Sequence, residues 1–222
     1  MVNRSRQAQQ PKEIRIYVEG GGDNKDTKAQ LRQGMHEFLQ NIYTEARKNR
    51  IRKNRIKVNL TACGRRNSAF EDYCNALKSH PTAINILLVD AEAAVTKDSV
   101  LKHLGARDPS WQENSQFRHL DEDTIHLMVQ VMETWLLADP DCLEKYYGQG
   151  FLANSLPKAA NLENVPKNTV EQALNHATEK TQKGKYHKIN HGLVLLGRLD
   201  PAKVRQRCPH CDRFCTYLET HL

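Results

Sequence analysis

The chain has 222 residues, a formal net charge of +7 and a sequence pI of about 9.1, so it is long enough to bury one large hydrophobic core. Its mean hydropathy is −0.71, and no run approaches the ~18 consecutive apolar residues of a membrane helix. These values exclude membrane-spanning helices and favour an anionic partner, such as nucleic acid.

Residues 1–12 are polar and basic and lack the apolar stretch of a secretory signal. They are predicted to form a disordered tail. Because no secretory signal is recognisable, we expect a cytoplasmic protein. We also expect its six cysteines to be thiols and not members of a disulfide framework.

Strand and helix patterns alternate over the first two thirds of the chain. The segment 84–89 is a continuous apolar run, which is typical of a strand covered on both faces, whereas 25–49 has apolar residues at helical spacing. The predicted elements are, in chain order, a strand at 14–18, a helix at 25–49, a strand at 55–62, a helix at 68–78, a strand at 84–89, a helix at 98–104, a long polar loop at 107–123, a strand at 124–131, and helices at 132–138 and 142–147, the latter capped by Asp139.

After Gly150 the pattern becomes helical, with predicted helices at 169–180, 192–199, 201–207 and 212–220. This order predicts an α/β fold in which a mostly parallel sheet carries helices on both faces, followed by a helical C-terminal extension. The predicted division is a basic tail at 1–12, a catalytic core at 13–150 and the helical extension at 151–222.

Acidic residues follow two of the predicted buried strands. Glu19 ends the first strand, and Asp90 and Glu92 follow the third at a spacing that puts both on one face of an extended segment. Because ligands bind at the carboxyl ends of parallel strands, we expect these acids to converge there as catalytic residues that hold Mg²⁺ or Mn²⁺. The alternative is structural: the glycines after Glu19 form a tight turn, and the other two acids cap a helix. The further candidate metal ligands are Asp23 and Glu133.

Basic residues cluster where a phosphate backbone would bind. Arg65 and Arg66 follow the second strand and are expected at the same edge of the sheet. Lys188 is a candidate catalytic residue that neutralises transition-state charge, and Lys185 belongs to the same basic segment. Simple solvent exposure of charged segments is the alternative in each case. The remaining predicted nucleic-acid-binding residues are Arg50, Arg52, Lys53 and Arg55.

Two further motifs bear on zinc binding and on ATP hydrolysis. Cys208 and Cys211 form a C-x-x-C pair, but no second pair of ligands follows at standard spacing, so structural zinc is not expected. The glycine-rich segment at 20–22 lacks the spacing of a P-loop, and we expect no ATPase module within the chain.

The order strand–Glu–Gly, helix, strand, helix, strand–Asp-x-acid resembles the Toprim domain of topoisomerases, primases and OLD-type nucleases. In that family a Glu after the first strand acts as general acid or base, and a D-x-D motif after a later strand holds Mg²⁺. Glu19 matches the first element. Asp90 and Glu92 match the second, with Glu in place of its second Asp.

Nearly the whole chain is similar to the bacterial DUF4276 family of small Toprim-like proteins. This resemblance implies a Toprim-like fold and an association with ATPases in phage-defence loci. The matching segments are IRIYVEGGGD (14–23), ACGRRNSAFEDYCNALK (62–78), LLVDAE (87–92), HLMVQVMETWLLADP (126–140), KGKYHK (183–188) and a terminal LDPAKVR…CDRF.

These features together predict a Mg²⁺-dependent Toprim-type nuclease that cuts DNA or RNA as the effector subunit of an antiviral system with an ATPase partner. One alternative is a non-catalytic interaction or sensor subunit of the ATPase complex. Another is a small-molecule phosphotransferase or hydrolase, which predicts a closed pocket over the acids. We expect the ATPase to contact exposed residues of 107–123 and 201–222, and the sequence leaves homo-oligomerisation open.

Overall fold

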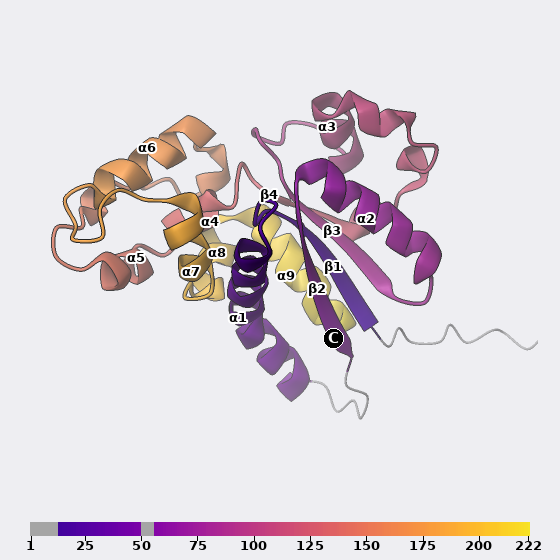
Figure 1. Cartoon of the computed structure of the whole chain (residues 1–222), viewed down its shortest axis with the longest axis horizontal. Helices are drawn as coiled ribbons and strands as arrows, with labels where there is room; N and C mark the ends of the chain where they lie inside the picture. The colour runs from indigo at the N-terminus through magenta and orange to yellow at the C-terminus, as the bar shows by residue number, and fades with distance from the viewer. Residues whose placement is uncertain (1–12, 50–55) are drawn as a thin grey trace, which may run out of the picture.

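The computed structural model describes residues 13–49 and 56–222, and at its centre lies a sheet of four strands (Figure 1). All three neighbouring strand pairs are parallel, so the predicted α/β fold class is confirmed. The strand order is β2-β1-β3-β4, where β1 is Glu13–Glu19, β2 is Lys57–Gly64, β3 is Ile84–Asp90 and β4 is Ile125–Met128.

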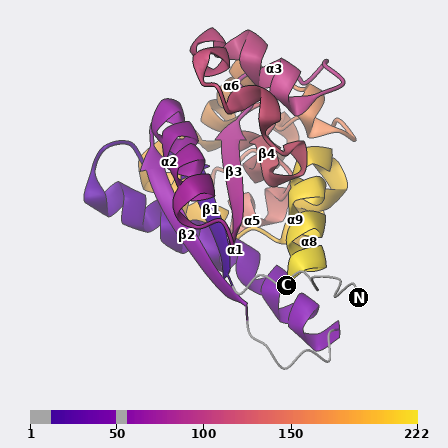
Figure 2. The ribbon, with the colours of Figure 1, turned by 90° about the vertical axis from the view of Figure 1, so that its right-hand side faces the viewer.

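Helices cover both faces of the sheet, as predicted (Figures 1 and 2). The side chains of β3 alternate between the two sides: Ile86 and Leu88 pack with α1, whereas Leu87 and Val89 pack with α2. Among the described residues, no helix combines the length and the apolar character needed to cross a membrane. The helices between residues 13 and 150 are α1 (Lys25–Asn49), α2 (Arg66–Ser79), α3 (Val100–Arg107), α4 (Glu133–Leu137) and α5 (Pro140–Tyr147).

The chain after β4 departs from the predicted strand at 124–131. The strand ends at Met128. The backbone after it turns toward the end of β3, and the N–H of Met132 donates to the side chain of Asp90 at 2.9 Å. The short helix α4 then begins. Asp139 caps α5 through its side chain, as predicted.

The segment 107–123 is mostly exposed, as expected of the predicted polar loop, but it is more ordered than a loop and buries Trp111, Phe117 and Leu120. It forms three 3-10 turns, at Pro109–Glu113, Phe117–His119 and Glu122–Thr124. Trp111 is buried and stacks on Phe70 of α2, with ring centroids 4.1 Å apart and planes within 7°. The polar composition of this segment did not predict this contact, because a few large aromatic side chains are enough to form it.

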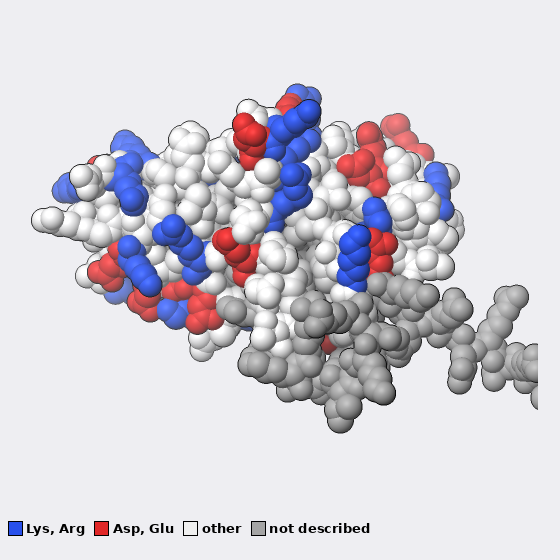
Figure 3. Space-filling view, turned by 60° about the horizontal axis from the view of Figure 1, so that its bottom comes forward, with Lys and Arg blue, Asp and Glu red and all other residues white. Residues whose placement is uncertain are grey.

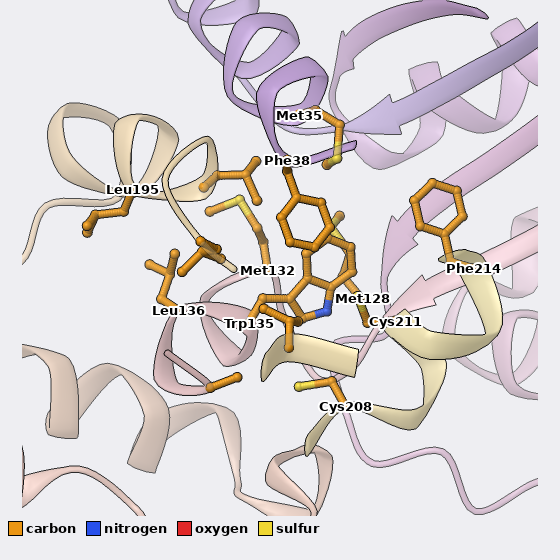
Figure 4. Close-up of a cluster of buried hydrophobic side chains, with 14 of the residues drawn as sticks. Met35, Phe38, Met128, Met132, Trp135, Leu136, Leu195, Cys208, Cys211 and Phe214 are labelled. Carbon is orange, nitrogen blue, oxygen red and sulfur yellow. The ribbon is translucent and has the colours of Figure 1, made fainter. Parts of the chain in front are cut away.

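The C-terminal helices pack into the same hydrophobic cluster as α1 (Figure 4). Cys208, Cys211 and Phe214 are fully buried, and they line this cluster together with Phe38 and Trp135. The expectation that residues 201–222 are exposed is therefore wrong for the inner face of this segment. The elements here are α6 (Lys167–Thr178), a π-helical turn (Lys188–Gly192), α7 (Leu193–Leu196), α8 (Pro201–Arg207) and α9 (Pro209–His221), with 3-10 turns at Ala153–Ser155 and Leu162–Asn164.

His126 of β4 lies beneath α9. Its ring centroid is 5.1 Å from those of Phe214 and Tyr217, and its side chain is 1% exposed. Burial, assisted by the nearby charge of Arg213, lowers the pKa of His126 to about 3. The folded protein therefore keeps this ring neutral at pH values where the unfolded chain protonates it.

Above about pH 6.5 His126 is neutral in both the folded and the unfolded chain and does not lower the free energy of unfolding. Below this pH we expect the free energy of unfolding to fall as the pH drops toward 3. At pH 5 the loss relative to pH 7 is about 2 kcal/mol, since one pKa unit corresponds to ~1.36 kcal/mol. Urea denaturation of His126→Phe at pH 5 and 7 should show a smaller difference than the wild type. The exposed His119→Phe serves as control, and an unchanged pH dependence in His126→Phe would contradict the assignment.

Candidate metal centre

Three acids converge at the carboxyl edge of the sheet, as predicted. Glu19 ends β1 and Asp90 ends β3, and these two strands are hydrogen-bonded neighbours. One carboxylate oxygen from each of Glu19, Asp90 and Glu92 can be chosen so that all three lie within 4.8 Å of one another. The parallel register explains the meeting, because it brings the ends of both strands to one edge.

The first two acids are held by the backbone. Asp90 is buried, with 6% of its surface exposed, and its Oδ1 accepts the N–H of Met132 at 2.9 Å. The N–H of Asp90 donates to Oε2 of Glu19 at 3.0 Å. These bonds fix both carboxylates in position before any ligand arrives.

Glu92 reaches the group by a route that the sequence did not predict. It lies beyond the end of β3 with a φ of 62°, so the expected continuation of an extended segment is wrong. The backbone is fixed there because the N–H of Ala91 donates to Met128 at 2.9 Å and that of Glu92 donates to Gln130 at 2.7 Å. A left-handed conformation at a residue other than glycine is uncommon and often marks a functional site.

A glycine turn keeps the space next to the acids open. The three glycines at 20–22 all have positive φ, at 123°, 80° and 59°, and a Cβ on Gly64 would meet the backbone of this turn at 2.5 Å. The result is a cavity of about 300 Å³ whose wall includes Glu19, Asp90 and Lys188. We call it the acidic cavity.

Arg66 supports the acids from the side of α2. Its Nη1 lies 3.4 Å from Glu19, its Nε lies 2.7 Å from Asp108, and Nη1 also donates to the carbonyl of Asp90. The guanidinium lies 5.2 Å from the centre of the Trp111 ring, and only 12% of the side chain is exposed. We predicted nucleic-acid binding for Arg66. Because its charge is directed into the protein, we instead assign it to positioning Glu19.

Two lysines face the acids from the C-terminal part of the chain. Lys188 Nζ lies 3.8 Å from Asp90 and 3.3 Å from both carboxylate oxygens of Glu133. Lys167 forms an ion pair with Glu92. Their side chains are 55% and 43% exposed, so both ammonium groups retain access to solvent.

The crowded acids have shifted pKa values. Burial raises the pKa of Asp90 to about 8 from an ordinary 3.8, with Lys188 opposing the shift and the neighbouring acids adding to it. Burial also raises the pKa of Glu19, although Arg66 opposes the change. Burial alone would lower the pKa of Lys188, but the charges of Asp90 and the other nearby acids outweigh it and raise the pKa. Without a metal, the folded protein therefore keeps Asp90 protonated where the unfolded chain ionises it, so this group lowers stability as the pH rises from about 4 to about 8.

The donor set fits a hard divalent cation. Mg²⁺ takes oxygen ligands at about 2.0–2.1 Å, which places opposite ligands about 4 Å apart, so small side-chain shifts bring the three carboxylates onto one ion. Glu19, Asp90 and Glu92 would supply these oxygens. The added positive charge would also stabilise the ionised carboxylates that burial disfavours.

The other predicted ligands lie outside this group. Asp23 is exposed on the glycine turn and pairs with Arg65 at 3.0 Å, so its prediction as a metal ligand is not supported. Glu133 is buried close by, but Lys188 lies between it and Asp90, and Tyr186 donates to it at 3.2 Å. Glu133 therefore holds the lysine instead of joining the three acids.

The predicted nucleic-acid contacts fall in different surroundings. Arg65 is 78% exposed and available at the edge of the acidic cavity's turn, and Lys185 is exposed. On the face drawn in Figure 3, acidic and basic side chains are interspersed. The remaining predicted contacts lie outside the described residues: Arg50, Arg52, Lys53 and Arg55.

Sequence reasoning missed Lys167, Arg107 and Tyr186. Lys167 is the first residue of α6 and follows Pro166, a helix-start signal that was available, but the helix was predicted to begin two residues later. Arg107 ends α3 with its Nη2 3.9 Å from Glu92. No local signal connects either cation to an acid so far away in the chain.

A family described as a domain of unknown function (DUF4276) matches residues 18–219. The chain belongs to the DUF4276 family. The match includes the three converging acids and both lysines of the site in this DUF4276 protein. No curated protein and no solved structure matches the chain.

Proposed function

We propose that this DUF4276 protein is a Mg²⁺- or Mn²⁺-dependent phosphodiesterase that cuts nucleic acid, with a site arranged as in Toprim nucleases. The supporting observation is the convergence of Glu19, Asp90 and Glu92 within 4.8 Å beside the ammonium group of Lys188. Acids alone also occur without a function. A recessed acidic cluster beside a lysine supplies a cation site and a positive charge, both of which phosphoryl transfer can use.

Each residue has a distinct task in this proposal. A cation bound by the three acids supplies Lewis-acid activation of a phosphoryl oxygen. Lys188 binds a second phosphoryl oxygen and offsets its developing charge. Glu19, whose Oε2 accepts the N–H of Asp90, would take the proton of the water that attacks the phosphorus, as the P–O bond to the leaving group breaks and the leaving oxygen is protonated by solvent. Arg66 keeps Glu19 in this orientation.

One observation favours the alternative of a non-catalytic interaction subunit. Each of the three acids already has a cationic partner within the chain, as in the pairs of Glu19 with Arg66 and Glu92 with Lys167. Such a network can be purely structural. A structural network predicts no metal-dependent change in stability or activity.

The test is hydrolysis of methyl p-nitrophenyl phosphate, a small activated diester, by the purified full chain with Mg²⁺ or Mn²⁺. We expect slow turnover that EDTA abolishes, together with a rise in melting temperature on addition of Mn²⁺. Hydrolysis that is absent with both metals, together with an unchanged melting temperature, would reject the enzyme in favour of the interaction subunit.

The antiviral role and the ATPase partner stay predictions from the family resemblance. The chain itself contains no P-loop sequence, so ATP-driven control has to come from another subunit. We expect the isolated chain to be weakly active or silent on nucleic acid and to co-purify with an ATPase from its native host. Vigorous cleavage by the lone chain, with no ATPase recovered, would contradict this control while leaving the phosphodiesterase proposal intact.

A further inference from the structure

A second cavity adjoins the acidic cavity. It has a volume of about 340 Å³, lies against α6, and is lined by Lys167, Asn175, Tyr186 and Glu133, among others. We call it the α6 cavity. Lys188 lines both cavities, so the lysine that faces the acids also stands between the two spaces.

Lys188 lies between an acid of one cavity and an acid of the other. Its ammonium group reaches Asp90 on one side at 3.8 Å and Glu133 on the other at 3.3 Å. The side chain is 55% exposed and projects from the π-helical turn that starts at this residue. A phosphate bound beside the acids would attract this ammonium. Because Lys188 lines both cavities, the two units joined by that phosphate would each lie next to one of the cavities.

The two cavities differ in chemistry. Met128, Met132 and Leu193 give the acidic cavity an apolar wall, which suits the face of a base. The α6 cavity carries both donors, Lys167 and Asn175, and the carboxylates of Glu133 and Glu171, a mixture that suits the hydroxyl groups of a sugar. Each volume is at the lower end of the range for small-ligand pockets and too small for stacked base pairs.

The depth of the acids also restricts the substrate. The side chain of Asp90 is 8% exposed and that of Glu19 is 16% exposed. A duplex keeps its bases stacked and paired, so it cannot insert one phosphate with both flanking units into two recesses without unpairing them. A single strand can turn its successive units apart at little cost.

We infer that the substrate is single-stranded at the reacting phosphate, with one flanking unit in the acidic cavity, the other in the α6 cavity, and Lys188 on the phosphate between them. This inference rests on the proposed phosphodiesterase function. It makes Asn175 a specificity-determining residue, although it lies outside the group of acids and lysines that acts on the phosphate.

The experiment compares wild type with Asn175→Trp, which fills the α6 cavity from a half-buried position of α6. His176→Trp is the matched control, because it adds the same ring one position away at a residue that does not line the cavity. Glu171→Trp fills the cavity from one helical turn earlier and replaces Asn175→Trp if that variant fails to fold. Each protein is assayed with Mn²⁺ for hydrolysis of methyl p-nitrophenyl phosphate and of a labelled oligonucleotide, as a single strand and as a duplex.

We expect wild type to bind the single strand at least about tenfold more tightly than the duplex by fluorescence anisotropy, with Ca²⁺ in place of Mn²⁺; tenfold corresponds to ~1.4 kcal/mol. Asn175→Trp should lower single-strand affinity and cleavage about tenfold, whereas His176→Trp should leave both within about twofold of wild type.

Equal affinity for single strand and duplex, or an unaffected Asn175→Trp, would overturn the inference even if the small diester is hydrolysed. Hydrolysis of the small diester with no affinity for either form of the oligonucleotide would overturn it in favour of a small-molecule substrate. Failure to hydrolyse any diester would reject the proposed function instead, and the anisotropy measurement would still decide the strand preference.

Discussion

Replacing Glu19 by Gln or Asp90 by Asn is expected to lower metal-dependent cleavage by more than about 100-fold. Groups that only orient a metal ligand already account for 10- to 100-fold in metal affinity or activity, so loss of a ligand charge should cost more. The amide oxygens can still accept the N–H groups of Asp90 and Met132. Alanine would leave those donors unpaired and would mix a folding defect into the result.

Stability measurements separate this effect from misfolding. Without metal, Asp90→Asn should be at least as stable as wild type above pH 8, because it removes a buried charge whose pKa is raised to about 8. Asp23→Asn is the control, since Asp23 is an exposed acid on the neighbouring turn and should retain activity within about twofold. Wild-type cleavage by the Glu19→Gln, Asp90→Asn double variant would remove both acids from the mechanism.

Trp135→Ala is expected to reduce the free energy of unfolding by about 3–5 kcal/mol, the usual cost of truncating a fully buried aromatic residue. Trp135 has no exposed surface and stacks on Phe38 of α1, with ring centroids 5.3 Å apart (Figure 4). It joins α4 to α1 at the centre of the larger core cluster. Urea denaturation measures the loss.

The same variant tests whether this core supports the site. Trp135 is three residues after Met132, whose N–H holds Asp90, so a loosened α4 should also weaken Mn²⁺ binding. Leu143→Ala, a fully buried truncation in α5, is the control for a core defect farther along the chain. A loss below about 1 kcal/mol in Trp135→Ala would mean that α1 and α4 are not held together by this contact.

Local patterns were sufficient to predict the sheet and the meeting of two acids. The apolar run at 84–89 predicted a strand buried on both faces, and the helical spacing at 25–49 gave α1 with its observed bounds. Both signals come from burial, which repeats along the chain with the period of the element. Once parallel strands were predicted, Glu19 and Asp90 had to meet at one edge.

The rest of the site depends on contacts between segments distant in sequence. Glu92 approaches the acids through a positive φ and a bond to Gln130, neither of which leaves a pattern in the sequence. Arg66 looked like a surface cation beside Arg65, and only the packing of Trp111 shows that it is buried against Glu19. The positions of charged residues follow no period along the chain, so the ion pairs that they form can be identified only in the folded structure.

The most direct test of the metal centre is an anomalous difference map from crystals of the full chain soaked in Mn²⁺. We expect one peak within bonding distance of oxygens of Glu19, Asp90 and Glu92, with Lys188 moved away from Asp90. Ion pairs of Asp90 with Lys188 and of Glu19 with Arg66 that persist at millimolar Mn²⁺, with no peak between the acids, would contradict the metal site and the function proposed from it.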